Sequence, residues 1–274
     1  MPIRPAAVAG SWYPGEPERL AAEIDVYLEA ATLPPLPGRV VALVSPHAGL
    51  RYSGAVAAHA YKTLEGRGRL TVVLVGPSHR AAFVGVSVHA SGAFETPLGP
   101  LAIDEAMTAR IVGAHPLIVD AARPHRDEHS LEMQLPFLRH VVPDSAIVPM
   151  LMGTQSREEV TALAPVLAAA AAGRSDVVLV ASSDLSHYHP APIANALDAE
   201  VVGDVERFDS EGLMARLERT QGHACGGGPM VAVMIAARML GATQGTALRY
   251  ADSGDAGERD KGRVVGYLAA AFCA

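Results

Sequence analysis

Short apolar runs alternate along the chain with longer segments whose apolar residues recur at helical spacing. Apolar runs that are rich in β-branched residues and bounded by Gly, Pro or Ser are typical of β-strands. Several runs are apolar at every position, which favours strands covered on both faces of a sheet. The pattern predicts strands at residues 40–44, 70–75, 84–88, 146–151, 176–181, 246–251 and 264–272.

The segments between these runs carry signals for the beginning and end of helices. Ser156 followed by Glu159 has the pattern of a capping box before an alanine-rich run. Ser53 and Asp104 are each predicted to cap the helical segment that follows them. Gly241 fits the position just past the end of an apolar helix. The order of the elements therefore alternates between strand and helix.

This alternation predicts one α/β domain over residues 1–274, with three α/β/α layers around a central mixed, largely parallel sheet. Half of the residues are apolar, which is enough for one large core. The formal net charge of −7 argues against a nucleic-acid partner, which would need a basic surface. No apolar run approaches the roughly 18 residues of a membrane span, and no signal-peptide layout is present. Because Cys225 and Cys273 do not make a disulfide framework, we expect a cytoplasmic protein without a membrane partner.

Polar side chains follow three of the predicted strands. His47 comes three residues after the run 40–44, and His79 comes four residues after the run 70–75. Asp184 and His187 follow the third strand in the stretch "SSDLSHYH". Ligands bind at the carboxyl ends of strands in open α/β sheets, so we expect these side chains to share one edge. Each histidine by itself is more typical of a solvated or merely hydrogen-bonded loop residue than of a site, but three strand ends with the same arrangement favour a site.

Cys225 lies in the stretch "HACGGGPM", directly before a predicted helix. The free N–H groups at a helix N-terminus favour a thiolate over a thiol. A thiolate with two imidazoles is a ligand set for Fe, Cu or Zn, and it leaves an open coordination position. The residues alone leave other readings open, namely a nucleophile, a redox thiol, or a buried cysteine in a glycine-rich turn.

Two further segments offer groups that fit the surroundings of a site. His129 and Glu132 are three residues apart and are predicted to share a helix face. They are either acid or base groups that line the site or the solvated start of a helix. Trp12 is predicted to wall a pocket or to close the edge of the core, and Tyr52 to line the mouth of the pocket.

Taken together, these motifs resemble the Memo family over roughly residues 4 to 270. The resemblance rests on six stretches in the family's order: "AGSWYP", "SPHAGLRYSG", "GPSHR", "DEHSLEMQLPFL", "SSDLSHY" and "ACGGGP". In bacteria and archaea, members of this family are named as the B component of an AMMECR–Memo–radical-SAM set. The resemblance therefore implies AMMECR-type and radical-SAM proteins as possible partners. It also implies a LigB-like fold, that of the class III extradiol dioxygenases, which hold Fe(II) on two His and a Glu.

By this resemblance, His47, His79 and Cys225 match the metal-site positions of the family. Asp184 and His187 match polar positions that line the same pocket. A cysteine stands where the dioxygenases have a carboxylate, and a thiolate changes the donor strength and charge of the site. The implied cofactor is one metal ion, with Fe(II) favoured and Cu or Zn as alternatives.

The first hypothesis for the function is metal-dependent redox or oxygenase-type chemistry on a small molecule or a peptide. His187 is the best candidate for a general acid or base because the unperturbed pKa of histidine lies near neutrality. Asp184 is expected to orient it. The hypothesis requires Cys225 to lie within about 7 Å of His47 and His79, because metal–ligand bonds are only about 2.0–2.3 Å long.

Two other functions stay open from the sequence. One is a non-catalytic protein that binds a peptide or partner through Arg4, Trp12, Arg51 and Tyr52, since eukaryotic family members are described as motility mediators that bind phosphotyrosine peptides. The other is a zinc-dependent hydrolase, with His187 or Glu132 as the base that activates a zinc-bound water.

Overall fold

The computed structural model describes residues 2–220, 222–257 and 261–274. In this part of the chain, a nine-stranded mixed sheet has the strand order β10-β12-β2-β9-β3-β8-β4-β7, with β11 paired to β12. The strands of the sheet are β2 (Val40–Ser45), β3 (Thr71–Pro77), β4 (Val86–Val88), β7 (Ile118–Asp120), β8 (Ala146–Met152), β9 (Val177–Ser182), β10 (Asp184–His189), β11 (Gln244–Asp252) and β12 (Val264–Cys273). A smaller sheet contains β1 (Ile3–Arg4), β5 (Ala93–Phe94) and β6 (Leu101–Ala102).

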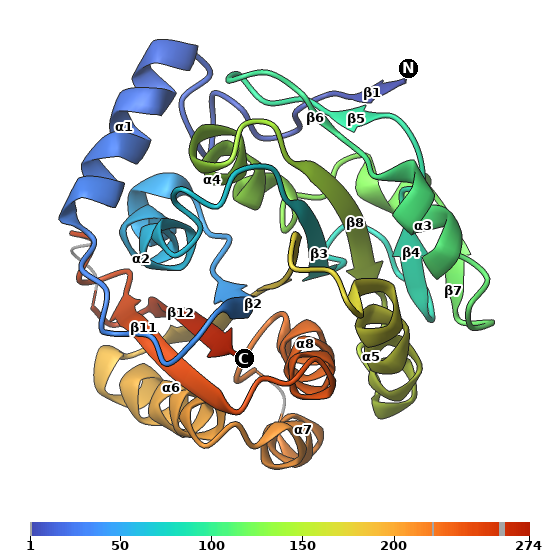
Figure 1. Cartoon of the computed structure of the whole chain (residues 1–274). Helices are drawn as coiled ribbons and strands as arrows, with labels where there is room; N and C mark the ends of the chain where they lie inside the picture. The colour runs from blue at the N-terminus through green and yellow to red at the C-terminus, as the bar shows by residue number, and fades with distance from the viewer. Residues whose placement is uncertain (1, 221, 258–260) are drawn as a thin grey trace.

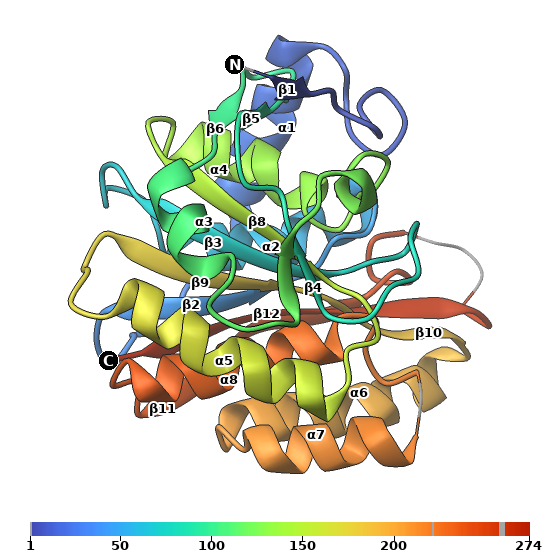
Figure 2. The ribbon, with the colours of Figure 1, turned by 90° about the vertical axis from the view of Figure 1, so that its right-hand side faces the viewer.

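Helices cover both faces of the large sheet (Figures 1 and 2). One face carries α1 (Pro17–Ala30), α2 (Leu50–Lys62) and α4 (Leu135–Val141). The other carries α3 (Glu105–Ile111), α5 (Arg157–Ala171), α6 (Ala191–Glu206), α7 (Ser210–Arg219) and α8 (Gly227–Met239). Two 3₁₀ turns, η1 (Arg123–His125) and η2 (Glu132–Gln134), precede α4. The predicted three-layer α/β/α domain is confirmed.

The strand β3 shows why the apolar runs are continuous. Val72 and Leu74 pack into the core under α1, α2 and α4, whereas Val73 and Val75 pack into the core under α5 and α8. Successive side chains of a strand point to opposite faces, so a strand between two helical layers needs apolar residues throughout. The central strands β2, β9, β3 and β8 are parallel, and antiparallel pairs flank them on both sides. Each predicted strand is present.

The strand β10 was not predicted. The stretch that forms it was expected to be a loop past the end of β9, but it pairs antiparallel with β12. Its polar residues give no apolar signal, and the pairing is interrupted by register shifts around His187. Tyr188 adopts a φ of 62° there, which is uncommon for a residue other than glycine. Long-range pairing with β12, rather than local pattern, makes this segment a strand.

The predicted helix signals are confirmed in part. The carboxylate of Asp104 accepts a hydrogen bond from the backbone N–H of Met107 at 2.9 Å, and Gly241 follows α8 with a φ of 92°. Ser53 does not cap a helix, because α2 begins at Leu50 and the Ser53 hydroxyl donates back to the carbonyl of Ala48 at 2.9 Å. The prediction missed this start because no capping side chain marks it.

The expected capping box of α5 is half formed. The Ser156 hydroxyl accepts from the backbone N–H of Glu159 at 3.2 Å, as predicted. The Glu159 carboxylate instead accepts from the backbone N–H groups of Gly85, at 2.6 Å, and Gln155, at 2.7 Å. The described helices include none with the length and apolar character that a membrane crossing requires.

Candidate metal centre

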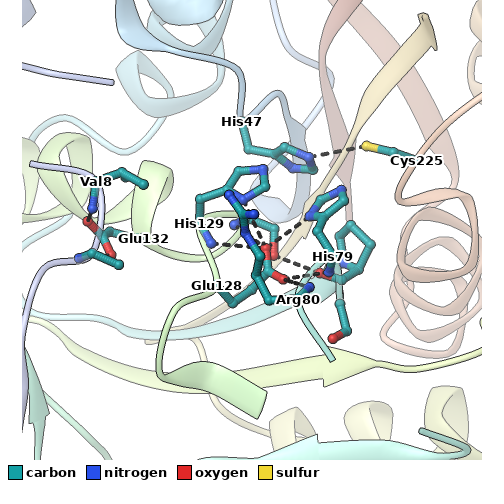
Figure 3. Close-up of polar contacts among 12 residues, drawn as sticks. Val8, His47, His79, Arg80, Glu128, His129, Glu132 and Cys225 are labelled. Atoms are coloured by element: carbon teal, nitrogen blue, oxygen red, sulfur yellow. Dashed lines mark hydrogen bonds and ion pairs between the residues drawn. The ribbon is translucent and has the colours of Figure 1, made fainter. Parts of the chain in front are cut away.

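Three histidines from distant parts of the sequence meet at the carboxyl edge of the parallel strands (Figure 3). His47 follows β2, His79 follows β3, and His129 precedes η2. One ring nitrogen from each lies within 4.8 Å of one from each of the others. The ring centroids are 5.2 Å apart for His47 and His79, and 4.5 Å apart for His79 and His129. The strand ends thus converge as predicted, and His129 joins them.

His47 is buried, and a serine fixes which of its ring nitrogens carries the proton. The Ser182 hydroxyl lies 2.9 Å from His47 Nδ1 and donates its own hydrogen to the carbonyl of Ser130 at 2.6 Å. The Ser182 oxygen therefore accepts from Nδ1–H, which leaves a lone pair on Nε2. Burial, with the neighbouring His79, lowers the pKa of His47 to about 3. At neutral pH its ring is a neutral imidazole, and the lone pair of Nε2 can bind a metal ion.

Glu128 organises the other two histidines. Its carboxylate accepts from the backbone N–H of His79 at 2.5 Å, from His79 Nδ1 at 2.9 Å, and from the backbone N–H groups of His129 and Ser130 at 2.9 Å each. Because a carboxylate only accepts, His79 is protonated at Nδ1 and its Nε2 is free. Burial raises the pKa of Glu128, but the hydrogen bonds from His79 and Ser130 outweigh it and hold the pKa at about 2.

His129 is buried beside Trp12, with ring centroids 4.4 Å apart. Its Nδ1 lies 3.3 Å from Glu128 Oε1 but has no well-formed hydrogen bond to any described residue. Burial first, and then His47, lower its pKa to about 4. His129 was predicted to line the pocket, and the geometry places it among the candidate ligands.

Cys225 lies at the side of the histidine cluster. Its Sγ is 3.1 Å from His47 Nε2, which confirms the expected proximity of these two residues (Figure 3). Cys225 is not a member of the set of mutually close ligand atoms. Burial, and then the charge of Asp184, raise the pKa of its thiol, so the expected stabilisation of the thiolate is wrong for the metal-free chain. The first residue of α8 is Gly227, and desolvation outweighs the effect of the helix end.

The donor atoms suit a borderline transition-metal ion. Donors in a tetrahedral site with bonds of about 2.0–2.3 Å lie roughly 3.3–3.6 Å apart. The ligand nitrogens of the three histidines lie within 4.8 Å of one another, whereas Cys225 Sγ lies 3.1 Å from His47 Nε2 but outside this mutually close set. The ring nitrogen Nδ1 of His129 is buried and has no hydrogen-bond partner among the described residues. The three histidines therefore could hold one metal ion, and a Cys225 thiol that joined them would lose its proton on binding.

The two predicted catalytic residues are close to the cluster but do not form a pair. Asp184 is buried and accepts from the backbone N–H groups of His47, at 2.7 Å, and Ala48, at 3.2 Å. It therefore positions the loop that carries His47. His187 is partly exposed on β10, and its Nδ1 donates to the carbonyl of Leu185 at 2.7 Å, which leaves Nε2 free. In the part of the chain that the structure describes, Asp184 and His187 interact through their charges but share no hydrogen bond or ion pair that would orient the ring.

Glu132 was predicted to be an acid or base of the site, and that prediction is wrong. Its fully buried carboxylate pairs with Arg4 and accepts from the backbone N–H of Ala7, at 2.7 Å, the N–H of Val8, at 2.9 Å, and the hydroxyl of Tyr13, at 2.7 Å. Figure 3 shows it well apart from the histidines. The segment before η2 is not α-helical, so the predicted shared face with His129 does not exist.

Trp12 lies beside the histidine cluster, whereas the roles of Trp12 and Tyr52 in lining a pocket stay predictions. Trp12 covers His129, and its carbonyl accepts from the backbone N–H of Leu50, which ties the N-terminal segment to the start of α2. Tyr52 is half-buried, and the guanidinium of Arg51 lies 4.7 Å from its ring centroid.

Sequence reasoning missed the roles of Glu128 and Ser182. The only local signals were an acid next to His129 in "DEHS" and a serine at the end of a strand.

The fold and the site define a three-layer α/β protein with a histidine-rich candidate metal centre at the carboxyl edge of its parallel strands. A family model described as "Memo-like protein" matches residues 4–271, and the chain belongs to the Memo family. It is similar to a MEMO1 family protein of Methanothermobacter thermautotrophicus, at 38% identity over 97% of this chain and 98% of the relative. It is also similar to MEMO1 family proteins of Methanosarcina mazei, at 39% identity over 98% of both chains, and of Sulfolobus acidocaldarius, at 36% identity over 98% of this chain and 99% of the relative.

Proposed function

We propose that this chain binds one transition-metal ion through His47 and His79 and uses it for redox chemistry. The observation that carries the proposal is the convergence of three imidazoles, with ligand nitrogens within 4.8 Å of one another, beside the Cys225 sulfur. Such a set is uncommon as simple packing, because neutral imidazoles and a thiol lose hydration without gaining strong mutual bonds. It is a suitable ligand set for a borderline ion.

His129 and Cys225 compete for the position of third ligand. His129 lies within the mutually close set and has an unpartnered ring nitrogen. Cys225 is 3.1 Å from His47 Nε2, and a bound ion would favour its thiolate. Either ligand set, a thiolate with two imidazoles or three imidazoles, suits Fe(II), Cu or Zn, and of these ions Fe(II) and Cu can change oxidation state. We favour Fe(II) with Cys225 as ligand and His129 close to the open side.

The protein residues around the ion have separate tasks in this proposal. The bound metal supplies electron transfer or activation of a coordinated substrate. Glu128 and Ser182 hold two of the imidazoles in their ligand tautomers. Trp12 excludes water on the side of His129. His187 has a free Nε2 and can move a proton to or from a substrate at the rim.

Metal titration tests the binding step. Protein purified without oxygen and stripped of metal should bind one Fe(II) per chain by calorimetry. His79→Ala should abolish this binding, whereas His59→Ala, on α2 and outside the cluster, should not change it. Cys225→Ser and His129→Ala identify the third ligand by which of them weakens binding more. A thiolate-to-metal charge-transfer band in the Co(II) form, lost in Cys225→Ser, would confirm sulfur ligation. Wild-type affinity and stoichiometry in all three cluster variants would sink the proposal.

Oxygen uptake tests the redox step independently. With a reductant, the Fe(II)-loaded wild type and the His59→Ala control should both consume O₂ faster than the His79→Ala variant and faster than Fe(II) in buffer without protein. Uptake equal to that of free Fe(II) would overturn the redox part and leave metal binding intact. Amide or ester turnover with a redox-silent ion would then favour the hydrolase alternative, in which Glu132 cannot be the base because it holds the N-terminal segment.

Other expectations stay predictions at this stage. They are a peptide ligand at the pocket near Trp12, association with AMMECR-type and radical-SAM proteins, and a cytoplasmic location. Co-purification with each candidate partner, with and without bound metal, would test the association.

A further inference from the structure

A cavity lined by arginines lies beside the candidate metal centre. Its volume is about 470 Å³, within the range of small-molecule sites. Its charged lining comes from the loop after β3 and from the segment around η1, and consists of Arg80, Arg123, Arg126 and Asp127. The chain as a whole has a formal net charge of −7, so three arginines around one cavity are a local reversal of charge.

Two of these arginines are free to bind a ligand. Arg126 forms an ion pair with Asp127 at 2.8 Å. The guanidinium groups of Arg80 and Arg123 have no ion pair or hydrogen bond with any residue in the described ranges, although both line the cavity. Guanidinium groups match the oxygens of carboxylates and phosphates by charge and by their forked donors. The cavity therefore presents two guanidinium groups without a hydrogen-bonded partner among the described residues, and of the two Arg80 also interacts with the charge of Asp127.

The rest of the lining is apolar. Phe83, Pro124 and the two alanines between Arg80 and Phe83 complete the wall. A ligand that satisfies both parts of the lining carries an anionic oxygen group and an apolar body. Inorganic anions would satisfy only the arginines, and neutral apolar molecules only the other wall.

The cavity is joined to the metal centre through one loop. Arg80 is the neighbour of His79, and Glu128, next to Asp127, accepts from the backbone N–H groups of both Arg80 and His79 (Figure 3). The residues 80–83 line this cavity and also a neighbouring hollow of about 690 Å³ that includes His79. A molecule anchored at Arg80 is therefore held beside a candidate metal ligand.

We propose that Arg80 and Arg123 anchor the anionic oxygen group of a small substrate with an apolar body, next to the metal centre. That the ligand is a substrate rests on the proposed function. The anion site itself does not require the metal. The proposed anion site indicates the substrate class, namely small carboxylates or phosphate esters. The metal ligands alone do not indicate the charge of the substrate.

Anion binding to the metal-free protein tests the proposal. Benzoate should bind saturably by NMR titration, and benzamide, its neutral analogue of nearly the same shape, should bind at least about tenfold more weakly. Arg80→Gln and Arg123→Gln should each weaken benzoate binding about fivefold or more, whereas Arg19→Gln on α1 should not change it. A parallel titration with phenyl phosphate, which keeps the aromatic ring of benzoate, distinguishes the head groups, since the tighter ligand names the group that the arginines prefer. Equal affinity for benzoate and benzamide, or unchanged affinity in both variants, would overturn the proposal.

The same variants separate this proposal from the metal site. Arg80→Gln and Arg123→Gln should bind metal with wild-type stoichiometry, and metal-free His79→Ala should still bind benzoate. If the protein binds metal but does not prefer benzoate to benzamide, only the anion site is contradicted. If it prefers benzoate but does not bind metal, only the metal proposal is contradicted. In the Co(II)-loaded protein, ring protons of bound benzoate should relax faster than in the Zn(II)-loaded protein. Equal relaxation would show that the cavity does not serve the metal centre.

Discussion

Glu128 holds His79 at two points, accepting from its backbone N–H at 2.5 Å and from its ring Nδ1 at 2.9 Å. The first contact fixes the loop after β3, and the second fixes the rotation and tautomer of the ring. Both require the carboxylate to be ionised, which its pKa of about 2 ensures at neutral pH. Hydrogen bonds of this kind behind a metal-bound imidazole raise its basicity and orient its free nitrogen. The candidate centre therefore depends on a residue that does not belong to the ligand cluster.

Glu128→Gln should weaken metal binding about 10- to 100-fold without changing the number of ions bound at saturation. The amide preserves the shape of the side chain but removes the charge that fixes the proton on His79 Nδ1. Calorimetric titration of Fe(II) or Co(II) into the stripped variant measures the change. Asp127→Asn, at the exposed neighbouring position, is the matched control and should bind as the wild type. An unchanged affinity in Glu128→Gln would mean that ring orientation does not limit binding.

Gly226→Ala should destabilise the protein by about 1–3 kcal/mol and displace the loop that carries Cys225. A Cβ atom at Gly226 would lie 2.2 Å from the carbonyl oxygen of Ser182, so the loop must move away from β9. Urea denaturation measures the stability, and the Co(II) charge-transfer band measures sulfur ligation. Gly15→Ala is the control, because its nearest neighbours would lie 3.5 Å from the new carbon. Equal urea midpoints for the two variants would contradict this account of the glycines.

Glu132→Gln should reduce the free energy of unfolding by about 3–5 kcal/mol, because it leaves the buried charge of Arg4 without its partner. The N-terminal segment should become sensitive to proteolysis, because the new amide nitrogen cannot accept and at least one of the donors of Ala7, Val8 and Tyr13 loses its acceptor. The metal stoichiometry should stay at the wild-type value. Glu18→Gln on the exposed side of α1 serves as the control for loss of one negative charge. A stable variant with a defective centre would instead support a role in the site.

Metal-free protein should lose stability as the pH falls below about 6.5, and His125 should account for part of the loss. Burial first, and then His89, lower the pKa of His125 in the folded chain to about 3. Between pH 6.5 and 3 the unfolded chain binds a proton that the folded chain does not. The free energy of unfolding therefore falls with pH, by at most about 1.4 kcal/mol per pH unit for this one proton.

Urea titrations at pH 7, 6 and 5 in the presence of a chelator measure this slope. His47 and His129 contribute with the same sign, because their pKa values are also lowered. His125→Phe removes the contribution of one proton, so its slope should be smaller than that of the wild type even if its stability at pH 7 is lower. A slope identical to that of the wild type would show that His125 does not titrate on unfolding in this range.

The pattern of apolar residues determined the layered α/β fold and the positions of its apolar strands. A run such as 70–75 has no polar face, and a strand between two helical layers buries both of its faces. The same pattern placed His47 and His79 at one edge, because parallel strands end on the same side of a sheet. The motifs around these residues were enough to indicate the Memo family before the comparison confirmed it.

Only the tertiary structure decided which polar residues complete the centre. His129 and Glu128 reach it because the irregular chain before η2 passes the ends of β2 and β3, whereas Glu132 turns to Arg4 and the N-terminal segment. The polar strand β10 exists because β12 provides its hydrogen-bonding partner. These outcomes depend on contacts between residues far apart in sequence, and local periodicity and capping patterns report only the burial and conformation of neighbouring residues.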